Sequence, residues 1–141
     1  MSKPFQTVLV GICLFIVLSG PVTAEVPPPD QLSIQAARYL ELLDQYRFGE
    51  TWQEMSTLFQ ALGNQNHWQR RQKIIRSTYG SLVSRQFYRI DYRQSYSLSP
   101  DGQYVIVQFK SSYQNKAETI ESVVFDCSTS SECSIREYVI R

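Results

Sequence analysis

Between residues 30 and 80, apolar residues recur at spacings of three and four, which is the period of an α-helix. The pattern predicts three helices, over residues 31–47, 51–62 and 67–79. Thr51 and Glu54 have the spacing of a capping box at the start of the second helix. Gly49, Gly63 and Gly80 follow the three segments and are suited to ending them.

After Gly80, apolar and polar residues alternate, which is the period of a β-strand. The alternation predicts four strands, over residues 85–98, 104–113, 119–127 and 133–140. In the first of them, Tyr88 and Tyr92 should share one face, and Arg85 and Arg89 the opposite face. Short turns join the strands, so consecutive strands should be antiparallel neighbours. The sequence therefore predicts an α+β fold, with three N-terminal helices packed on one face of a four-stranded antiparallel meander sheet.

The second and third predicted strands carry apolar side chains on both faces. In the second strand, Tyr104 and Ile106 alternate with Val105 and Val107. The helices should cover one face of the sheet. We expect the other face to be either a partly covered pocket or a contact surface.

The first 24 residues have the order of a secretory signal peptide. Lys3 is followed by an uncharged apolar run, Val8–Leu18, and then by small residues that end at Ala24. The run is too short to span a bilayer, which takes about 20 residues. The sequence thus predicts a signal peptide (1–24), a Pro-rich leader (25–29) and a single α+β domain (30–141) that is exported to the bacterial periplasm or secreted. No stable membrane insertion is expected after cleavage.

Cysteine usage and charge agree with export. Removal of Cys13 leaves two of the three cysteines, Cys127 and Cys133, across a short polar turn. Thiols form lasting disulfides outside the cytoplasm, so we expect this pair to be bonded. Removal of Lys3 leaves 14 − 1 = 13 basic residues against 13 acidic ones. A neutral domain is not expected to bind nucleic acid, which attracts proteins with a basic excess.

Several segments, taken in order, resemble the bacterial domain-of-unknown-function family 4019. They are Phe48–Trp52, Leu82–Arg85, Pro100–Phe109, Asn115–Ala117 and Arg136–Arg141. The resemblance extends from about Ala36 to Arg141 and implies a small exported domain, without an assigned activity. The order of helices and strands also resembles, more weakly, the cone-shaped α+β fold of nuclear-transport-factor-2-like proteins.

Few residues suggest catalysis or a cofactor. His67 is the sole histidine, and its place at a helix start is typical of a surface residue. No pattern of metal ligands is present, so we expect neither a metal nor a cofactor. Carboxylates on the predicted strands or near the first helix end could serve in acid–base chemistry: Asp44, Glu50, Asp91, Glu121, Asp126 and Glu137. The simpler interpretation is a solvated strand face on which they have cross-strand partners such as Arg85, Arg89 or Arg136.

Two surfaces are candidates for binding. Tyr88, Tyr92 and Tyr104 should lie on the open face of the sheet, and Arg85 and Arg89 could extend a basic stripe that Arg70, Lys73 and Arg76 form on the third helix. The leading hypothesis is a non-enzymatic binding or protein-interaction module, with a second copy, an envelope protein or a small ligand as its partner. A small-molecule hydrolase or isomerase with a pocket between helices and sheet is one alternative. A secreted inhibitor or host-directed factor is another.

Overall fold

The computed structural model describes residues 26–128 and 132–141. The predicted signal peptide and Glu25 lie outside this part of the chain. Its helices are α1 (Pro29–Asp44), α2 (Phe48–Gln53), α3 (Thr57–Leu62) and α4 (Gln65–Tyr79). Its strands are β1 (Leu82–Arg93), β2 (Tyr104–Tyr113), β3 (Lys116–Asp126) and β4 (Ser134–Ile140).

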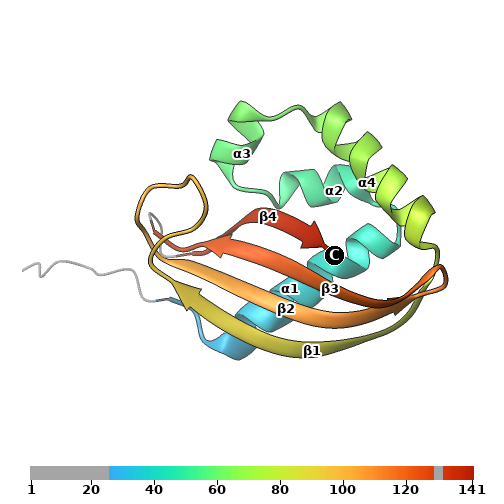
Figure 1. Ribbon diagram of the computed structural model, residues 1–141. Helices are drawn as coiled ribbons and strands as arrows, with labels where there is room; N and C mark the ends of the chain where they lie inside the picture. The colour runs from blue at the N-terminus through green and yellow to red at the C-terminus, as the bar shows by residue number, and fades with distance from the viewer. Residues whose placement is uncertain (1–25, 129–131) are drawn as a thin grey trace, which may run out of the picture.

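The predicted sheet is confirmed. The four strands pair in the order β1-β2-β3-β4, and each neighbouring pair is antiparallel. Helix α1 crosses one face of the sheet, here called the helix face, and α4 packs against α1 and α2 (Figure 1). The core lies between α1 and the sheet, where Leu32, Tyr39 and Leu43 meet Val107 and Val123.

The prediction of three helices is wrong in one place. The expected helix over residues 51–62 is two short helices, because the chain between them pairs with β4. Met55 forms an isolated bridge with Ile135, and the Ser56 N–H donates to the Ile135 carbonyl at 2.6 Å. The Ser56 side chain then accepts from the Phe59 N–H and so caps α3, in place of the expected capping box.

Strand β1 also differs from its prediction, because it contains a β-bulge between Phe87 and Arg89. Phe87 pairs with Phe109 and Ile90 pairs with Val107, so both lie on the helix face. A bulge puts two successive residues on one side of a strand. Tyr88 therefore faces the same way as Arg89, toward the face of the sheet opposite the helix face, here called the open face. The expected alternation through Tyr88 is wrong.

Strand β1 ends at Arg93, five residues before its predicted end. The loop of residues 94–103 is closed by a hydrogen bond from the Gly102 N–H to the Gln94 carbonyl at 2.8 Å. The Tyr96 hydroxyl donates to Glu137 of β4 at 2.5 Å, and its ring contacts the Tyr104 ring. The loop thus folds over one end of the open face and covers Tyr104 there.

Cys127 and Cys133 form a disulfide, as predicted. The bond joins the residue after β3 to the residue before β4, so it clips the connection between these two strands. In the described part of the chain, no helix is long and apolar enough to cross a bilayer.

Candidate functional site

A buried polar cluster lies between the helices and the sheet, at the end of the sheet near the β2–β3 turn. Each of the longer elements contributes to it: Asp44 of α1, Arg76 of α4, Arg85 of β1, Ser111 and Tyr113 of β2, Glu121 of β3 and Tyr138 of β4. We call these seven residues the buried polar cluster. Burial of so many polar groups costs free energy unless each one finds a partner.

Glu121 is the centre of the cluster and is 0% exposed. Its Oε1 accepts from the Tyr113 hydroxyl at 2.7 Å and from the Tyr138 hydroxyl at 2.8 Å. Its Oε2 accepts from Arg85 Nε at 2.7 Å and from the Ser111 hydroxyl at 2.5 Å. Glu121 lies on the helix face because it follows the same alternation as Val123 and Phe125, its apolar neighbours on β3.

Two arginines balance the carboxylates. Arg76 is 1% exposed, contacts Glu121 Oε1 at 3.3 Å and also donates to the Tyr113 hydroxyl. Arg85 donates to Glu121 and, through Nη1, to Asp44 Oδ2 at 2.6 Å. With Asp44 and Glu121 ionised, the cluster has two positive and two negative charges, so it is neutral overall.

The pKa values of these groups follow from their surroundings. Burial alone raises the pKa of Glu121, but the nearby charges of Arg85 and Arg76 outweigh burial, so its pKa lies below the ordinary value. For Tyr113 and Tyr138, burial and the Glu121 charge both raise the pKa of the phenol. At neutral pH the carboxylate is therefore ionised, and both tyrosines remain neutral donors to it.

This geometry is suited to holding the fold together and poorly suited to proton transfer. A general base needs an accessible lone pair and a pKa near the working pH. Glu121 instead accepts from five side chains on its two oxygens, has no exposed surface and has a lowered pKa. Among the described residues, no group of three or more His, Cys, Asp or Glu comes together in the manner of metal ligands.

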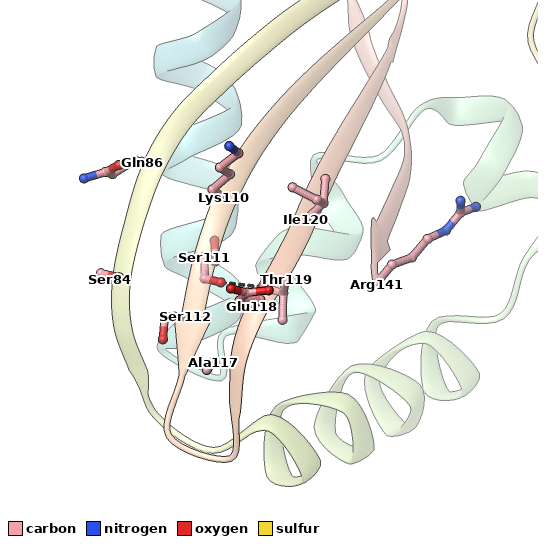
Figure 2. A pocket seen from close by; sticks show the side chains of 10 residues that line it. All are labelled: Ser84, Gln86, Lys110, Ser111, Ser112, Ala117, Glu118, Thr119, Ile120 and Arg141. Atoms are coloured by element: carbon pink, nitrogen blue, oxygen red, sulfur yellow. Dashed lines mark hydrogen bonds between the residues drawn. The ribbon is translucent and has the colours of Figure 1, made fainter.

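The open face of the sheet carries a shallow hollow of about 500 Å³ near the same end (Figure 2). Its lining comes from β1, β2, β3 and the residue after β4: Ser84, Gln86, Lys110, Ser111, Ser112, Ala117, Glu118, Thr119, Ile120 and Arg141. In Figure 2, Gln86 and Arg141 point away from each other and out of the hollow. The polar groups therefore do not converge on one point, as they would around a small ligand.

The structure separates the five residues that the sequence suggested for binding. Arg85 lies on the helix face inside the buried polar cluster, whereas Arg89 is exposed on the open face and donates to Gln108. Tyr104 is 3% exposed beneath the 94–103 loop. Tyr92 is exposed on β1 but lies on the helix side, so its predicted place on the open face is wrong. The predicted basic stripe is likewise interrupted, because Arg76 turns into the core.

Tyr88 and Arg89 do lie together. The Arg89 guanidinium carbon is 5.4 Å from the centre of the Tyr88 ring, and Lys110 Nζ is 4.3 Å from the same ring. Both side chains are exposed at the bulge of β1. Of the suggested residues, these two form the pair that the fold brings onto one exposed surface.

A family model described as Protein of unknown function (DUF4019) matches residues 35–138, from α1 to β4. The chain belongs to the DUF4019 family. All seven residues of the buried polar cluster lie inside the matched segment, so the cluster is part of the DUF4019 domain of this chain. The resemblance seen in the sequence is thereby confirmed.

Neither the comparison with curated proteins nor the comparison with solved structures gives a match. The likeness to nuclear-transport-factor-2-like proteins therefore stays a prediction.

Strand carboxylates do pair with arginines, but the expected solvated strand face is wrong for Glu121, which is buried, and the cluster was not predicted. The observed pairs include Arg85 with Glu121 and Arg136 with Asp126. A signal was present: Glu121 occupies an inward position between Thr119 and Val123 in the alternation of β3. A charge at an inward position requires a buried partner.

Proposed function

We propose that this DUF4019 domain is an exported protein-interaction module that binds its partner along the exposed edge of β1. The observation that carries the proposal is the concentration of apolar surface on this strand. Of the 11 exposed large hydrophobic side chains in the described residues, five belong to β1. They are Leu82, Val83, Phe87, Tyr88 and Tyr92.

The position of β1 at the edge of the sheet adds to this argument. Its far side has no neighbouring strand in the described residues, and the strand is 12 residues long. Proteins usually shorten or cover such an edge, because it can pair with a strand of another chain. A long edge with exposed aromatic side chains is therefore suited to binding by strand addition.

The interior supports an interaction module over an enzyme. The carboxylate that lies beside tyrosines, Glu121, is enclosed and saturated with donors. The hollow on the open face has side chains that diverge (Figure 2). The β1 edge is the surface where exposure, apolar character and unpaired backbone coincide.

Site-specific photocross-linking in the living cell tests this function. A photoreactive phenylalanine analogue replaces Phe87, which is 55% exposed, and in a separate strain it replaces Ile74 of α4, which is 66% exposed. We expect protein adducts from position 87 and none from position 74. Absence of adducts at 87, or equal adducts at both positions, would refute the proposal.

Export is tested by the mass of the protein recovered from the envelope fraction. The expected chain starts at Glu25 and is two hydrogens lighter than its reduced form, because Cys127 and Cys133 are bonded. A full-length chain that starts at Met1 in the cytoplasmic fraction would refute export. It would leave the interaction result at β1 unaffected.

A further inference from the structure

We propose that the partner of the β1 edge is a second copy of this chain, paired antiparallel across a two-fold axis at the peptide between Tyr88 and Arg89. The inference rests on the proposed function and names its partner. It follows from the side-chain directions along β1. Arg85, Phe87, Ile90 and Tyr92 face the helix side, and Ser84, Gln86, Tyr88, Arg89, Asp91 and Arg93 face the open side.

Over residues 84–93, the order of helix-side and open-side residues is the same in both directions from the Tyr88–Arg89 peptide. The bulge produces this symmetry, because it places Tyr88 and Arg89 on the same face. In an antiparallel pair, residues opposite each other must point to the same side of the sheet. About this axis, every residue from 84 to 93 meets a residue of the second copy that shares its facing.

The bulge also favours a second copy over an ordinary strand. A regular strand presents one residue opposite the two residues of the bulge, which interrupts pairing. A second copy presents its own bulge at the same place, so that two residues oppose two. Two-fold pairing of this kind also gives a closed dimer, since the β1 edge of each copy is used by the other and no third chain can pair there.

On the helix side, the axis brings apolar groups together. Phe87 lies opposite Ile90 of the second copy, and the reverse pair repeats the contact on the other side of the axis. The Phe87 ring already packs edge-on against Phe109, at 6.1 Å between ring centres, while more than half of its surface stays exposed. Pairing would bury that remaining surface.

On the open side, the same axis keeps like charges apart. Gln86 lies opposite Asp91 of the second copy, and Arg89 lies opposite Tyr88 of the second copy. Within its own chain, Arg89 already packs against the Tyr88 ring. An axis centred on Arg89 would instead place Arg89 opposite itself. An axis centred on Phe87 would place Arg85 opposite Arg89. Like charges directly opposite each other destabilise a strand pair.

Engineered cross-links in the full chain, purified after export, test the pairing. The double variant Gln86→Cys with Asp91→Cys should form a covalent dimer, because these positions are opposite each other across the axis. Within one chain the two positions are about 17 Å apart, too far for a disulfide. The double variant Gln86→Cys with Arg93→Cys serves as the control. Its two positions would be opposite each other only about a different axis, so it should stay monomeric on a non-reducing gel.

The second measurement is the dissociation constant of the dimer, from sedimentation of the purified protein. Phe87→Lys should raise this constant by at least about 30-fold, the effect of losing one well-packed aromatic anchor. Ile74→Lys, at an exposed site on α4, should leave it unchanged. A monomeric wild type, a cross-link with the 86/93 pair, or a dimer that Phe87→Lys does not weaken would each overturn the inference.

These outcomes are distinct from failure of the proposed function. If β1 binds a different envelope protein, photocross-linking at position 87 still gives adducts, but their masses differ from that of a dimer. The purified protein is then monomeric. If β1 binds nothing, both experiments are negative.

Discussion

Replacement of Glu121 by glutamine tests the central role of the buried polar cluster. The variant keeps the size of the side chain and removes its charge, so that Arg76 and Arg85 face Asp44 alone. The new amide group also points N–H donors at groups that are themselves donors. The loss of one partner from a buried ion pair costs about 3–5 kcal/mol, because the remaining charge is left uncompensated.

This cost is a large share of the 5–15 kcal/mol that stabilises a typical domain. It corresponds to a fall in melting temperature of about 12–20 °C for a domain of this size. Urea unfolding at neutral pH measures it, with the fluorescence of the buried Trp52 and Trp68 as the signal. The midpoint should fall with no change in the slope of the transition.

Glu118→Gln is the matched control, since Glu118 is an exposed carboxylate on the same strand. It should change stability by no more than about 0.5 kcal/mol. If Glu121→Gln proves too unstable to purify, Asp44→Asn gives a milder test, because the Asp44 side chain is 19% exposed. We expect a loss of about 1–3 kcal/mol there. A loss below about 1 kcal/mol for Glu121→Gln would refute the view that the cluster stabilises the fold.

Three further predictions concern pH, the disulfide and a helix end. Because the pKa of Glu121 is lowered in the folded protein, its stabilisation is complete above the ordinary value of 4.5 and declines as the pH falls below it; urea midpoints on either side of that pH should show the decline in the wild type and less of it in Glu121→Gln. Reduction of the Cys127–Cys133 bond should cost about 2 kcal/mol, because the bond closes a loop with a sequence separation of only 6; an unchanged urea midpoint in reductant would contradict this. Gly80→Ala should destabilise by about 1–2 kcal/mol, because Gly80 has φ +78 and a new Cβ would lie 3.1 Å from Asn115. Thermal unfolding measures this last effect, and Gly49→Ala, whose Cβ would meet only ordinary contacts, should not reproduce it.

The bulge of β1 and the break between α2 and α3 are two places where local sequence patterns do not predict the structure. Alternation along β1 predicts one face for Tyr88 and Tyr92. In the pairing with β2, however, Tyr88 is the extra residue of a bulge, so it lies on the opposite face from Tyr92. The helical period over residues 51–62 is real, yet Met55 leaves it to pair with Ile135, which is 80 residues away in the chain. In both cases a contact with a distant strand outweighs a local preference.

The amino-acid sequence by itself determined that helices precede the strands, and it also determined the meander sheet, the disulfide and membership of the DUF4019 family. These properties depend on periodicity, turn residues and short-range spacing, which act over a few residues. Only the tertiary structure decided that Arg76 and Arg85 turn inward. Each contacts Glu121, which is more than 35 residues further along the chain, and local sequence patterns carry no information about contacts at such a separation. The facing pattern of β1 also depends on the tertiary structure, because a bulge exists only relative to the strand it pairs with.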